Sequence, residues 1–163
     1  YVLQKLDPYQ HIQYPQPGDI SKVPYAEPAW LVENFHSPYY SDSHRRLQRE
    51  MRVFTEKYVL PVAEKCEVSG ERPDVELVKL MGANGLNAMR LGPGKHLAGR
   101  KLFADIKPEE FDYFHELIIT QELSRCGTRG FMDALQGGMV IGLPPVINFG
   151  LSLIHISEPT RQA

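Results

Sequence analysis

The chain has 163 residues, a net charge of −2 and 42% hydrophobic residues, which are the proportions of an ordinary globular domain. A charge so close to zero provides no basic field for nucleic acid or anionic lipid, so neither class of partner is expected. The two cysteines, Cys66 and Cys126, form no CxxC motif and lack metal-ligand spacing, so two free thiols are expected.

The first forty residues combine proline with aromatic rings. Proline does not fit a regular helix, and the rings argue against a plain disordered linker. We expect residues 1–40 to form an extended arm that rings such as Trp30 and Phe35 pin to a surface. A ligand site built from these aromatic rings is the alternative.

A long helix is expected from Ser41 or Ser43, either of which can cap it. Apolar residues then recur at intervals of three or four, which defines one helix face: Leu47, Met51, Phe54 and Tyr58. Basic residues lie mostly off this face, and we expect them to be solvated: Arg45, Arg46, Arg49, Arg52 and Lys57. Pro61 is expected to kink or end this helix.

A second helix is expected from about Pro73, a good first-turn residue, to the Gly82 and Asn84–Gly85 breakers. Its apolar residues are Val75, Leu77, Val78, Leu80 and Met81. The following loop, residues 91–101, has three glycines but neither GxGxxG nor GK[ST]. A phosphate-binding loop is therefore not expected there.

A third helix is expected from about Pro108 to Arg125, with Glu109 and Glu110 in its first turn, where the macrodipole favours anions. Its expected core residues are Phe111, Phe114, Leu117, Ile118 and Leu123. Three further residues of this helix are of types that can bind metal, but the segment lacks the two histidines four residues apart that zinc proteases use. We expect these three to be exposed polar residues: His115, Glu116 and Glu122.

A fourth helix, joined to the third at a glycine, is built against its own propensity. It contains Gly137, Gly138 and Gly142, and each interior glycine costs about 1 kcal/mol relative to alanine. Pro144–Pro145 falls near its expected end. Small residues recur every four positions and form one narrow, bare stripe: Gly130, Ala134, Gly138 and Gly142. The stripe fits either a tight contact with another helix or a wall for a slim apolar ligand.

Residues 131–149 of this helix are the one candidate for a membrane span. Polar residues and the proline pair interrupt the apolar run: Asp133, Gln136 and Asn148. The uninterrupted apolar length is well short of 18 residues, so no membrane span is expected.

Four segments resemble, in order and spacing, the N-terminal helical domain of acyl-CoA dehydrogenases. HRRLQREMRVFTEKYVLPVAEKCE (44–67) is similar to the first helix of that domain, and DVELVKLMGANGLNAMRL (74–91) to the second helix and its turn. ELSRCGTRGF followed by IGLPPVINFG resembles the third and fourth helices. The opening PYAEPAWLVENFHSPYYSDSHRRL is similar to fungal members.

The resemblance implies an all-α fold over residues 41–150, with about four helices in an antiparallel-type set. In the family this domain packs on a β-domain and a C-terminal helical bundle. The implied activity is the FAD-dependent α,β-dehydrogenation of an acyl-CoA thioester. The catalytic base and most flavin contacts of the family lie in those other domains, so no catalytic or cofactor-binding residue is assigned here.

The resemblance also implies that the fourth helix forms one wall of the acyl pocket. The residues expected nearest the acyl chain are Ala134, Gly137, Gly138 and Ile141. The parent is expected to be an intracellular homo-oligomer, with a mitochondrial or peroxisomal location and the electron acceptor left open. The alternative is a stand-alone helical interaction domain whose small-residue stripe seats a partner helix.

Residues 151–163 do not continue the family pattern. LSLIHISEPTR (151–161) equals, residue for residue, one reading frame of a common sequencing-library adapter. We therefore expect a non-native, exposed or poorly ordered tail, excluded from fold reasoning. A native tail that matches by chance is the alternative.

Overall fold

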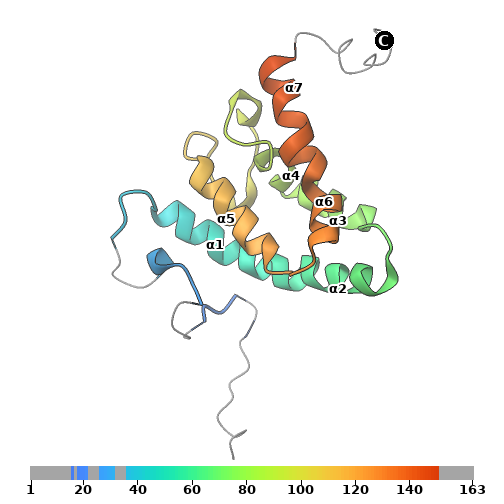
Figure 1. Ribbon diagram of the computed structural model, residues 1–163. Coiled ribbons are helices and arrows are strands. Elements are labelled where there is room, and N and C mark those ends of the chain that lie inside the picture. Colours follow the sequence, from blue (N-terminus) through green and yellow to red (C-terminus); the bar gives the residue numbers. More distant parts are fainter. Residues whose placement is uncertain (1–15, 17, 22–25, 32–35, 151–163) are drawn as a thin grey trace, which may run out of the picture.

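The computed structural model describes residues 16, 18–21, 26–31 and 36–150 (Figure 1). All regular structure in this part of the chain is helical, which confirms the predicted all-α class. The α and π segments are α1 Asp42–Phe54, η2 Thr55–Val59, α2 Leu60–Ser69, α3 Val75–Ala83, α4 Leu86–Met89, α5 Tyr113–Ser124, α6 Arg129–Gly137, η5 Gly138–Gly142 and α7 Leu143–Phe149. The short 3-10 turns are η1 Ala29–Leu31, η3 Lys95–Leu97 and η4 Phe103–Asp105.

One continuous rod, α1–η2–α2, forms the base of the domain (Figure 1). Ser41 is its N-cap. Of the two effects expected of Pro61, a kink or an end, the end is wrong, because the helix continues past this residue. Before that proline the Leu60 N–H bonds to the Thr55 carbonyl, a π turn, so the hydrogen-bond ladder shifts ahead of the residue that has no N–H. The rod ends at Gly70, whose φ of 71° is the left-handed conformation that closes helices.

The core lies between this rod and the helices above it, where α5 contacts α1 and α6 contacts α2. Leu47, Met51 and Phe54 are buried there as predicted, whereas Tyr58 is 40% exposed. Other helices add Met81, Leu86, Met89, Ile118, Ile119, Leu123, Phe131 and Leu135. In the N-terminal segment Trp30 is 6% exposed and stacks on Tyr40. Phe35 lies outside the described residues, as do residues 151–163, so both of those predictions stay predictions.

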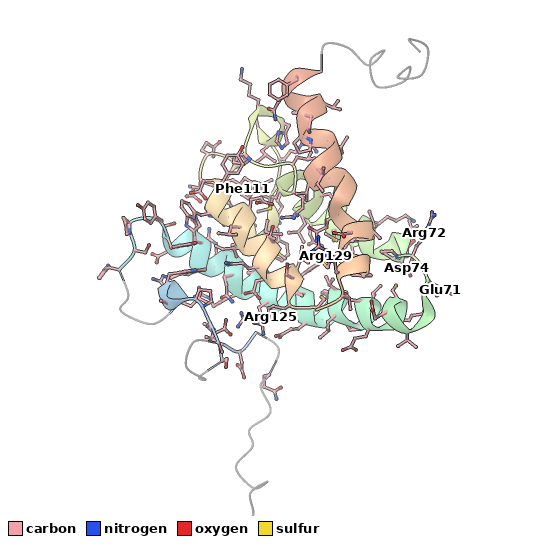
Figure 2. All side chains as sticks on the ribbon, viewed as in Figure 1. Glu71, Arg72, Asp74, Phe111, Arg125 and Arg129 are labelled. Atoms are coloured by element: carbon pink, nitrogen blue, oxygen red, sulfur yellow. The ribbon has the colours of Figure 1, made fainter. Side chains whose placement is uncertain are left out.

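Helix α5 begins later than predicted, at Tyr113 with Asp112 as its N-cap; Figure 2 shows Phe111 and Arg125 at its two ends. Glu109 and Glu110 therefore precede the helix and are not in its first turn. Phe111, Ile118 and Leu123 are buried as predicted, but the predictions for several other residues are wrong. Phe114 and Leu117 are 36% and 39% exposed, while His115 and Glu122 are 0% and 4% exposed.

Helices α1 and α5, the first and third of the predicted helices, run in the same direction. Near both N-termini His44 stacks on His115, with ring centroids 3.6 Å apart, and farther along Arg52 bonds to Glu122. Parallel neighbours place two positive dipole ends together. The Asp112 carboxylate offsets this, because it accepts from the Phe114 and His115 N–H groups and from His44 Nε2 at 3.0 Å.

The centre of the α1–α5 contact is a buried arginine, Arg52, which is 1% exposed. The prediction that Arg52 is solvated is therefore wrong. Arg52 Nη1 and Nη2 donate to the two carboxylate oxygens of Glu27 at 2.6 and 2.9 Å. Its Nε and Nη2 donate to the two oxygens of Glu122 at 2.9 and 2.8 Å. Nη1 also donates to the Asp19 carbonyl, so all five guanidinium hydrogens are engaged.

Hydrogen bonding in this cluster shifts the pKa values of Arg52 and Glu27 in the direction that favours their charged forms. Burial opposes the charged form of Arg52, but hydrogen bonds to Glu27 and Glu122 outweigh it and raise the pKa above its ordinary value. Burial likewise acts to raise the pKa of Glu27, but the hydrogen bonds from Arg52 and Ser21 and the attraction of the Arg52 charge together outweigh it, so the net shift is downward. Hydrogen bonds among these three side chains thus connect the N-terminal segment, α1 and α5.

We expect Arg52→Met to lower the free energy of unfolding by about 3–5 kcal/mol, because it leaves two buried carboxylates without their cation. Urea denaturation followed by circular dichroism measures the loss. The matched control is Lys79→Met, which breaks the exposed Lys79–Glu76 pair and should change stability by less than about 0.5 kcal/mol. Equal losses in the two variants would contradict the structural role of Arg52.

The histidine contact predicts acid sensitivity. Burial, reinforced by the neighbouring His44, lowers the pKa of His115 below 6.5 despite the hydrogen bond to Asp112. The folded state therefore binds fewer protons than the unfolded state, so stability is full above pH 6.5 and falls as the pH drops through the lowered value. Urea midpoints measured from pH 7.5 to 5 should show this decline. His115→Gln should reduce the decline, and the exposed His36→Gln should leave it unchanged.

Candidate functional site

The predicted site lies on a helix that runs without interruption through α6, η5 and α7. It starts after Gly127, whose φ of +68° ends the preceding helix. The prolines near its predicted end do not stop it. The Leu143 N–H bonds to the Gly138 carbonyl in a second π turn, and Pro144 and Pro145 follow in the first turn of α7, as Pro61 follows the π turn of the rod.

The four residues predicted to contact an acyl chain lie on the outer side of this helix. Ala134 and Gly138 are exposed, Gly137 is half-buried and Ile141 is 74% exposed. A Cβ added at Gly130, Gly137, Gly138 or Gly142 would meet no atom within 4 Å. Within the described residues no helix packs tightly on the stripe, and the space beside its backbone is open.

The first half of the stripe borders a groove. An open cavity of about 320 Å³ lies between α6 and the end of α2, and its lining includes Gly130, Phe131 and Ala134. The opposite side is formed by Cys66 and by Arg72, whose carbonyl accepts from the Cys66 thiol at 3.6 Å. Figure 2 shows Arg129 at the start of α6 and Arg72 on the loop after α2.

The second half of the helix projects away from the rod (Figure 1). No residue of η5 or α7 is buried in the described structure. Large apolar side chains are exposed along it: Ile141, Leu143, Ile147 and Phe149. By length and composition the helix could cross a membrane, but with a mean hydropathy of 1.2 it is not a clear membrane span.

A larger open cavity, of about 500 Å³, lies on the other side of this helix. Its lining includes Arg90, which is 4% exposed and donates to Glu116 at 2.6 Å and to Thr120 at 2.8 Å. This site was not predicted from the sequence motifs. Arg90 follows the apolar run of α4 directly, and a charged residue in that place was the available signal.

One cluster has the composition of a metal site: the ligand atoms of His44, Asp112 and His115 lie within 4.8 Å of one another. Their hydrogen bonds have a structural explanation. His44 and His115 each occupy the third position of a helix and complete the capping boxes of Ser41 and Asp112. We assign the cluster to helix capping.

The buried polar residues that connect the helices of the domain were also not predicted from the sequence. Arg52, Glu122 and His115 are charged or titratable, and average behaviour places such residues outside. A signal was present in α1, because His44, Gln48 and Arg52 recur every four residues directly beside the apolar stripe. All three are buried.

Comparison with known proteins agrees with this architecture. The model of the acyl-CoA dehydrogenase N-terminal domain matches residues 41–152. The chain is 37% identical over 135 residues to Acyl-CoA dehydrogenase AFT10-1 of Alternaria alternata, which covers 80% of this chain and 30% of that protein. It is 35% identical over 137 residues to Acyl-CoA dehydrogenase apdG of Emericella nidulans, covering 82% and 31%. No solved structure matches it significantly.

The chain thus spans slightly less than a third of the length of these curated relatives. The family match covers the helices from α1 to α7, including the glycine-rich helix. The chain belongs to the acyl-CoA dehydrogenase family, and what it contains is the N-terminal helical domain of such a protein.

Proposed function

We propose that the parent protein is an FAD-dependent acyl-CoA dehydrogenase that introduces an α,β double bond into an acyl-CoA thioester. In this proposal the chain supplies one wall of the acyl pocket. The family supports the reaction class. The observation that carries the wall is the open space beside Gly137 and Gly138, where an added Cβ meets nothing within 4 Å.

The chemistry of this surface suits an aliphatic chain. Most backbone groups of this helix bond within it, so a stripe without side chains is a largely apolar wall. With no side chains at Gly138 and Gly142, an acyl chain can approach the backbone closely, and Ile141 adds apolar surface at its edge. Each CH₂ group of the acyl chain that is removed from water in this way contributes about 0.8 kcal/mol to the free energy of binding.

The same surface does not fit a flavin. The stripe offers small and apolar groups without a donor, acceptor or charge that would hold an isoalloxazine ring or a pyrophosphate. We assign no flavin contact and no chemical step to these residues. FAD binding and proton abstraction are attributed to other parts of the parent, as are its homo-oligomeric state, its electron acceptor and its location in mitochondria or peroxisomes.

The alternative is a helical interaction domain, and the exposed Ile141, Leu143 and Phe149 favour it specifically. In the enzyme these side chains are covered by the remaining domains. The genomic sequence after Gly150 distinguishes the two proposals. A reading frame that continues into the β-domain supports the enzyme, and a stop codon close to residue 163 supports the interaction domain.

The acyl wall is tested by Gly138→Leu in the parent enzyme. We expect kcat/KM to fall about tenfold or more for the longest acyl-CoA accepted and to change little for short ones, because the leucine fills space that a long chain uses. The control is Asp133→Leu, which adds the same side chain at an exposed position off the stripe. A loss that is uniform across chain lengths, with a lower melting temperature, would indicate a packing role.

The assignment of FAD to other domains is tested with this chain alone. We expect the purified chain to show no flavin absorbance after incubation with FAD and no turnover of any acyl-CoA. Its exposed apolar helix should make it self-associate in analytical ultracentrifugation. A yellow, monomeric and active preparation would contradict the proposal.

A further inference from the structure

The 500 Å³ cavity has the size of a small-molecule site, since such sites are about 300–1,000 Å³. It lies between α7, the first turns of α5 and the loop after α4. Its helix wall is formed by Val140, Pro144 and Ile147. None of the four residues of the proposed acyl wall, Ala134, Gly137, Gly138 and Ile141, is among the residues that line this cavity. The cavity is therefore separate from the proposed acyl wall.

The charged groups of this cavity are predominantly basic. Arg90 and Lys95 line it, and Glu116 is the only carboxylate among its lining residues. Arg90 Nη1 is bonded to Glu116 Oε1 at 2.6 Å, so these two charges largely offset one another, and Lys95 supplies the net positive charge. Lys95 lies exposed at the opening. A ligand entering the cavity therefore meets a net positive charge.

Arg90 itself has unused binding capacity. It is 4% exposed, and its Nε has no hydrogen-bond partner among the described residues. Burial lowers the pKa of Arg90 below its ordinary value, and the attraction of Glu116 only partly opposes this effect. The Glu116 side chain is 23% exposed, so part of its charge is solvated. A second anion would offset the part of the Arg90 positive charge that Glu116 leaves uncompensated.

The remaining wall is apolar. Val140, Pro144 and Ile147 follow one face of the helix at intervals of four and three residues. Ile147 is 45% exposed, so a ligand that covers it removes apolar surface from water. The cavity thus combines a cationic end with an apolar side, and an amphipathic anion is the ligand that fits both.

We propose that this cavity binds a slender organic monocarboxylate, with its carboxylate group at Arg90 and Lys95 and its aliphatic chain along Val140, Pro144 and Ile147. Arginine binds carboxylates through directed, charge-assisted hydrogen bonds, which favours this head group. The aliphatic chain supplies the apolar contact that a simple inorganic anion lacks.

The test uses the full chain and isothermal titration calorimetry with octanoate as probe. We expect saturable binding of octanoate, with 1-octanol and acetate each at least about tenfold weaker, since one lacks the charge and the other the chain. Inorganic phosphate serves as a further probe. No saturable octanoate binding, or octanol or phosphate binding equally well, overturns the proposal.

Two matched variants locate the site. Ile147→Asp places a negative charge on the cavity wall and should weaken octanoate binding at least about tenfold. Leu143→Asp makes the same change at a position that is also 45% exposed but does not line the cavity, and it should leave binding unchanged. Lys95→Gln should weaken binding without affecting the fold. Equal effects of the two aspartate variants, or none from Ile147→Asp, overturn the assignment.

Discussion

The rest of the domain depends on one interaction, the hydrogen-bonded ion pairs of the buried Arg52 with Glu27 and Glu122. Arg52 is buried between Glu27 and Glu122, and its five hydrogens connect three segments that are distant in sequence. A buried guanidinium is tolerated only when its charge and its donors are matched, so the N-terminal segment and α5 must both be in place. Gln48, one turn earlier on α1, donates to the same Glu122 and fixes its orientation.

This central pairing explains the less usual features around it. With His44 against His115 and Arg52 against Glu122, α1 and α5 lie side by side in the same direction, and their positive N-termini meet. Asp112 lies at that end and accepts bonds from both helices. The stacked His44 and His115 rings fit here because each also completes a capping box. The histidine pair is thus a consequence of helix direction.

The glycine-rich helix has two different sides. Its first half is anchored by Phe131 and Leu135, whereas nothing in the second half is buried. One side is a bare stripe that fits an aliphatic chain, and the opposite side closes a basic cavity around Arg90. A π turn allows the helix to continue through its proline pair, so that Pro144 and Ile147 can line the cavity beyond the stripe. The two proposed ligand sites therefore share one structural element.

The sequence by itself determined the helical class, a serine cap at Ser41 or Ser43, the apolar stripe of α1, the break at Gly127 and the bare stripe of the fourth helix. These depend on local periodicity and on residue-specific backbone preferences, which neighbouring residues suffice to define. Only the tertiary structure decided that Arg52, Glu122 and His115 are buried. Burial of a charge depends on a partner supplied by a distant segment, and no local pattern specifies that partner. For the same reason the Arg90 cavity, formed by three separate elements, could not be predicted from any one of them.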